Sequence, residues 1–64
     1  MVIIEIQSNE GAPSVLFESI ENRNEAEQTY HTKLSFAAVS NVKAHSVTLL
    51  NDYGERVKGE TYFH

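Results

Sequence analysis

Three histidines are the residues of this chain best suited to metal binding or proton transfer near neutral pH. They are His31, His45 and His64. Their spacing contains no HxxxH pair, which would place two imidazoles on one side of a helix. A metal site would therefore need the fold to bring all three together. A histidine-based metal-binding protein is one alternative function.

The other reactive side chains form no recognisable catalytic pattern. The chain has no cysteine, and its serines do not occur in a G-x-S-x-G elbow. The glycines, Gly11, Gly54 and Gly59, are too scattered for a phosphate-binding loop. We also expect no carboxylate in apolar surroundings that would raise its pKa for general-acid catalysis. The sequence thus predicts a protein that is not an enzyme and uses no cofactor.

Negative charge is concentrated in the first half of the chain. Of the net charge of −4, residues 1–31 contribute six glutamates and one arginine, whereas residues 32–64 are slightly basic. Such a charge repels nucleic-acid phosphates and anionic lipid, so we expect no direct nucleic-acid or membrane partner. An alternative function is an acidic inhibitor or decoy that binds a nucleic-acid-handling enzyme through Glu18, Glu21 and Glu25.

The elements that must position these groups begin with two predicted strands. In Val2–Gln7 apolar residues alternate with Glu5 and Gln7, the period of a half-buried strand. Turn-forming residues around Gly11 and Pro13 then lead into Ser14–Ser19, a second, antiparallel strand. The inward set of this second strand is either Val15 with Phe17 or Leu16 with Ile20, and we favour the former.

A helix is predicted over Ala26–Ala38. Asn24, with Glu27 three residues later, resembles a capping box, although Glu21-Asn22 leaves an earlier start open. The helix should end near Val39-Ser40-Asn41. Its apolar stripe comprises Ala26, Tyr30, Leu34, Ala37 and Ala38, and Phe36 falls well off it.

The last third predicts a hairpin. His45–Asn51 and Arg56–Phe63 alternate in polarity and are joined by a turn in which Gly54 takes the left-handed position. The predicted fold is one α+β domain, 1–64, with an antiparallel four-stranded sheet and one helix on one face. The element order is ββαββ, or βαββ if Ser14–Ser19 is irregular.

One helix covers only one face of such a sheet, so the opposite face is a candidate interface. If Val47, Leu49, Val57 and Phe63 face the helix, alternation sends Lys58 and Glu60 to the other face. The apolar residues expected on that uncovered face are Ile3, Leu16, Leu50 and Tyr62. Phe36 is a further candidate contact. These residues predict protein–protein contact, with a homodimer expected through the uncovered face or through a strand edge.

Five short segments carry a resemblance to known proteins: Tyr30-His31, Ala37–Val42, His45–Gly54, Val57-Lys58 and Glu60–Tyr62. In these segments the chain resembles a group of very short, uncharacterised proteins encoded in phages and prophages of Gram-positive, gut-type bacteria. The similarity spans nearly the whole chain, and its motifs concern packing and turns. It implies a phage-related origin and a similar α+β fold. With that origin, the nucleic-acid-handling enzyme bound by the acidic decoy would be an enzyme of the bacterial host. With no basic segment before Glu5 and no long apolar run, we expect a location in the cytoplasm of the bacterial host.

Overall fold

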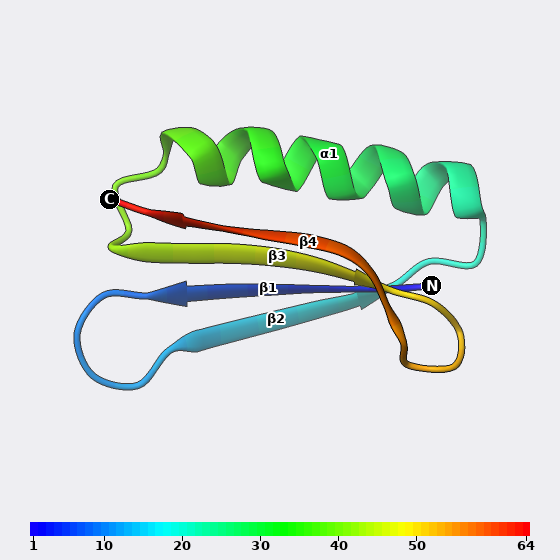
Figure 1. Ribbon diagram of the computed structural model, residues 1–64, viewed down its shortest axis with the longest axis horizontal. Coiled ribbons are helices and arrows are strands. Elements are labelled where there is room, and N and C mark those ends of the chain that lie inside the picture. Colours follow the sequence, from blue (N-terminus) through cyan, green and yellow to red (C-terminus); the bar gives the residue numbers. More distant parts are fainter.

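The computed structural model describes residues 1–64 as four strands and one helix in the order ββαββ (Figure 1). The strands form one antiparallel sheet with the order β2-β1-β3-β4, and the helix packs on one of its faces. The predicted α+β architecture is therefore confirmed, and the βαββ alternative is not needed because β2 is regular. The elements are β1 (Val2–Ser8), β2 (Ser14–Ser19), α1 (Arg23–Val39), β3 (Ala44–Leu50) and β4 (Arg56–Phe63).

The sheet consists of two hairpins placed side by side. β1 pairs with β2, and β3 pairs with β4, each through a short loop. The hairpins meet where β1 pairs with β3, from Val2 opposite Leu50 to Ser8 opposite Ala44. In the β3–β4 loop, Gly54 has φ +81° as predicted, and the Asn51 side chain accepts hydrogen bonds from the amides of Tyr53 and Glu55.

The helix begins two residues earlier than the capping pattern at Asn24 predicted. Asn22 is the N-cap, and its side-chain oxygen accepts a hydrogen bond from the Glu25 amide at 3.1 Å. The alternative start at Glu21-Asn22 is therefore the correct one. The helix ends at Val39, as predicted, with Ser40 as its C-cap. It is neither long nor apolar enough to cross a membrane.

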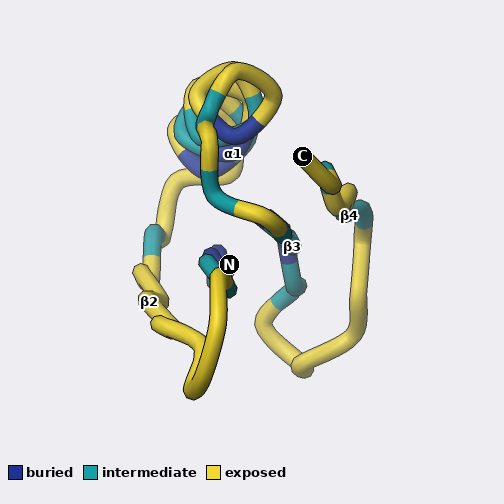
Figure 2. Tube along the Cα trace, turned by 90° about the vertical axis from the view of Figure 1, so that its left-hand side faces the viewer, coloured by how far each residue is buried: buried dark blue, intermediate teal, exposed yellow.

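The core lies between α1 and the two central strands. Ile3 of β1 and Val47 and Leu49 of β3 are almost fully buried beneath the helix. They pack against the underside of α1, which contributes Ala26, Tyr30 and Ala37. Phe36 lies off this stripe and is exposed, as predicted. Figure 2 shows the buried positions gathered between the helix and the central strands, and the side of the sheet away from the helix is uncovered.

The predicted assignment of residues to the two faces was wrong in part. Ile3 and Tyr62 lie on the helix side of the sheet, Ile3 buried and Tyr62 partly buried against the core. Leu16 is also on the helix side, because it pairs with Glu5. Leu50 does lie on the uncovered face. Val15, Phe17 and Phe63 were predicted to face the helix but lie on the uncovered face. Lys58 and Glu60 were predicted on the uncovered face but lie on the helix side.

The physical reason is that both faces of this sheet are apolar. In β1, Val2, Ile4 and Ile6 form the more apolar set, so the pattern favoured burying them. The helix instead covers Ile3 and Glu5, which are in register with the buried residues of β3. Alternation shows which residues share a face, but it does not show which face the helix covers.

Candidate functional site

Four polar side chains are linked between α1 and the sheet, toward the C-terminal end of the helix. The Ser40 hydroxyl is 3.0 Å from Nδ1 of His45, and Nε2 of His45 is 2.7 Å from Oε2 of Glu5. Nζ of Lys33 lies 3.5 Å from the other Glu5 oxygen. Burial raises the pKa of Glu5, but the His45 hydrogen bond and the Lys33 charge lower it, and the net pKa is below the ordinary value of 4.5.

This serine–histidine–glutamate arrangement resembles a hydrolytic triad in composition only. His45 is 4% exposed, and none of the hollows on the surface is lined by Ser40 or His45. No hollow therefore holds a substrate against the Ser40 hydroxyl and the His45 ring. Ser40 also follows a helix C-terminus, whose carbonyl groups disfavour a developing negative charge. The arrangement ties α1, β3 and β1 together and leaves no buried side-chain polar atom without a partner.

The sequence reasoning missed this buried pair. Glu5 lies between Ile4 and Ile6 and is buried, so one carboxylate is embedded in apolar sequence, although its pKa is lowered and not raised. Alternation places Glu5 on the same face as Ile3, but it does not show that the helix covers this face. The pairing of Glu5 with His45, 40 residues away, therefore had no local signal in the sequence.

The three histidines have separate environments. His31 is exposed and lies 3.7 Å from Glu27, His45 pairs with Glu5, and the His64 ring is 3.0 Å from the Ala37 carbonyl oxygen. No group of three His, Asp or Glu side chains is arranged to hold a metal ion. The geometry therefore gives no support to the histidine-based metal-binding alternative.

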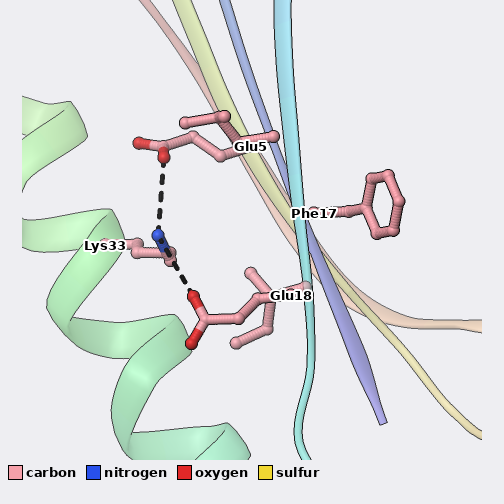
Figure 3. Close-up of a pocket in the computed structure, with 6 residues that line it drawn as sticks. Glu5, Phe17, Glu18 and Lys33 are labelled. Atoms are coloured by element: carbon pink, nitrogen blue, oxygen red, sulfur yellow. Dashed lines mark hydrogen bonds and ion pairs between the residues drawn. The ribbon is translucent and has the colours of Figure 1, made fainter.

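The first candidate surface is the sheet face opposite α1, which we call the open face. Phe17 and Phe63 are 77% and 80% exposed there, and in Figure 3 the Phe17 ring points away from the helix. No acidic residue occupies a strand position on this face. Its one charged side chain is Arg56, which lies over Gly59. The open face comprises Val2, Ile4, Ile6, Ser8, Val15, Phe17, Ser19, Ala44, Ser46, Thr48, Leu50, Arg56, Gly59, Thr61 and Phe63.

The second candidate surface is a groove between β2 and α1, which we call the β2–α1 groove. One hollow of about 200 Å³ is lined by Leu16, Glu18 and Lys33 with Ile3 and Glu5 at its base. An adjoining hollow shares Glu18 and Lys33 and extends along the helix to Phe36. Figure 3 shows Lys33 between the two glutamates, at 3.5 and 3.7 Å.

No protein-family model, curated protein or solved structure matches this chain.

The predicted contact residues are thus divided among four places. Leu16 and Glu18 line one hollow of the β2–α1 groove, and Glu18 and Phe36 line the adjoining one. Leu50 lies on the open face. Ile3 and Tyr62 lie on the helix side, where Ile3 is too buried to contact a partner. Glu21 and Glu25 lie at the exposed N-terminal end of α1, and neither forms an ion pair.

Proposed function

We propose that this is a small, non-enzymatic, phage-type protein that acts through protein–protein contact and self-associates through its open face. The observation that supports this is the composition of that face. It carries Val2, Ile4, Ile6, Val15, Phe17, Leu50 and Phe63, and no layer of the chain covers it. Contiguous apolar surface of this kind on a small domain marks an interaction site.

The dimensions of the face suit a second copy of the chain. Four strands about 4.8 Å apart, with about seven residues each, give a flat area of roughly 430 Å². Two such faces packed together bury on the order of 1,000 Å², near the lower bound for a specific interface. Face-to-face packing of two sheets about 10 Å apart would place one helix on each outer side.

The charge distribution also favours a second copy. A net charge of −4 opposes self-association in general. The acidic residues, however, lie in the loops, on α1 and on the helix side of the sheet, so two open faces meet without opposed carboxylates. The ion pairs of Glu10 with Lys43 and Glu27 with Lys58 further reduce the unpaired negative charge.

Adjacent residues of β2 provide a matched test of this proposal. Phe17 and Leu16 are both apolar and exposed, but they lie on opposite faces of the sheet. In sedimentation equilibrium between about 1 and 500 µM, we expect the wild type to dimerise and Phe17→Asp to remain monomeric. Leu16→Asp should still dimerise. A wild type that is monomeric throughout, or equal behaviour of the two variants, would overturn the proposal.

The acidic-decoy alternative receives less support. Of the three glutamates named for it, Glu18 is partly neutralised by Lys33 at 3.7 Å. The phage-related origin and the location in the bacterial cytoplasm stay predictions that rest on the resemblance.

A further inference from the structure

Strand β2 is an unprotected edge of the sheet. It pairs with β1 on one side only, and all six of its residues are exposed. The backbone of α1 packs close to β1, β3 and β4 but not to β2, which α1 reaches through the side-chain ion pair of Lys33 with Glu18. The outer row of β2 backbone N–H and C=O groups therefore has no partner strand, as Figure 2 shows at the side of the sheet away from β4.

The opposite edge, β4, is protected in ways that β2 is not. A bulge interrupts its pairing between Leu49 and Leu50 of β3. The Arg56 guanidinium donates a hydrogen bond to the Gly59 carbonyl at 2.9 Å, and Lys58 forms an ion pair with Glu27 of the helix. Bulges and charged side chains are common devices against pairing at an edge. β2 has no bulge and no basic residue, so the two edges differ in their readiness to accept another strand.

The β2–α1 groove lies directly beside this free edge. Its exposed apolar residues are Leu16, at 55%, and Phe36, at 67%. Its charged residues are Glu5, Glu18 and Lys33, which give a net negative groove. The distances of 3.5 and 3.7 Å from the Lys33 nitrogen to the two carboxylates are long for ion pairs. The carboxylate of Glu18 is half exposed, so it can bind a second cationic group.

From this geometry we propose that β2 binds an extended peptide segment of a partner protein as a fifth strand, with an apolar and a basic side chain in the β2–α1 groove. Alternate residues of an added strand point to the same face of a sheet. Residues i and i+2 of the segment would therefore both face the helix side, one against Leu16 and Phe36 and the other toward Glu18. Backbone hydrogen bonds would supply affinity, and the groove would supply selectivity.

The probe for this proposal is a displayed library of random heptapeptides, selected on the immobilised full chain. We expect enriched peptides to lack proline in their centre and to carry lysine or arginine two residues from an apolar residue. An enriched peptide is then synthesised in two further forms, one N-methylated at its odd-numbered residues and the other at its even-numbered residues. If binding uses the edge, one of the two N-methylation registers should weaken it by about tenfold or more, because backbone hydrogen bonds are lost.

Variants separate this site from the open face. Leu16→Lys and Glu18→Lys should each lower the affinity for the selected peptide by about tenfold. Phe63→Asp, on the open face, should leave this affinity unchanged. In amide NMR spectra the peptide should shift Ser14–Ser19 and the α1 residues near Phe36, and not β4.

Four outcomes would overturn the proposal. Selection on the wild-type chain could enrich no peptide more strongly than the same selection on the Leu16→Lys variant. The enriched peptides could lack a basic residue, or both N-methylated forms could bind as well as the parent. Loss of binding in Phe63→Asp with retention in Glu18→Lys would move the site to the open face. Because the Phe63→Asp protein is expected to be monomeric, peptide binding by that variant is independent of the proposed dimer.

Discussion

Ile3 and Ile4 offer the sharpest test of which sheet face the helix covers. They are identical in type and adjacent in β1, but Ile3 is 1% exposed beneath α1 and Ile4 lies on the open face with intermediate exposure. The same substitution at both positions therefore compares the two faces directly, because strand propensity and chain entropy are nearly the same for both.

The expected difference follows from burial. A domain of 64 residues is stabilised by about 3–10 kcal/mol, so Ile3→Ala, at about 2–5 kcal/mol, would remove most of that stability. The milder Ile3→Val should cost about 1 kcal/mol and lower Tm by about 4–8 °C. Ile4→Val should cost less than about 0.5 kcal/mol in the monomer, because part of its side chain already contacts water.

Urea denaturation monitored by circular dichroism measures both costs, at a protein concentration of about 2 µM to keep the monomer. The m-value should be the same for the wild type and both variants. Repeating the melts at about 200 µM should raise the cost of Ile4→Val, because dimerisation through the open face stabilises the native state. Equal costs at low concentration, or a larger cost at Ile4, would refute the face assignment.

Four further substitutions test local features of the structure. The pKa of Glu5 in the folded state is below its ordinary value of 4.5. The ionised carboxylate therefore stabilises the fold at pH values above 4.5, and this stabilisation is lost as pH falls through the folded-state pKa. In the Glu5→Gln variant, Tm should therefore fall less steeply than in the wild type as pH drops below about 5. An equal slope of Tm against pH in both proteins would contradict the pairing of Glu5 with His45. Asn22→Ala should cost about 1 kcal/mol in urea melts and Asn24→Ala less than half of that, whereas the reverse order would place the cap at Asn24. Gly54→Ala should cost about 1 kcal/mol, because φ is +81° there, and a neutral result would mean that the turn is not left-handed.

The parts of the fold that the sequence predicts are those set by local chemistry. The alternation of His45–Asn51, the left-handed Gly54 and the helix stop at Val39 each depend on residues close in the chain, and each agrees with the structure. The helix start was ambiguous because Asn22 and Asn24 are both good caps, and tertiary context decides between them.

The parts that the sequence does not predict depend on distant partners. Burying Glu5 is favourable only because His45 and Lys33, 40 and 28 residues away, meet it beneath the helix. Without that contact, the apolar set of Ile4 and its neighbours is the better choice for burial. The convergence of Leu16, Glu18 and Phe36 in one groove likewise depends on how α1 crosses the sheet.

The pairing of β1 with β3 is the only strand pairing between the two hairpins. Its partners are separated by 36 residues between Ser8 and Ala44 and by 48 between Val2 and Leu50. Closing loops of that length costs chain entropy, while each hairpin closes a much shorter loop. The rate of folding should therefore be set by the meeting of two preformed hairpins, and amides along this central seam should exchange with solvent only when the whole molecule opens.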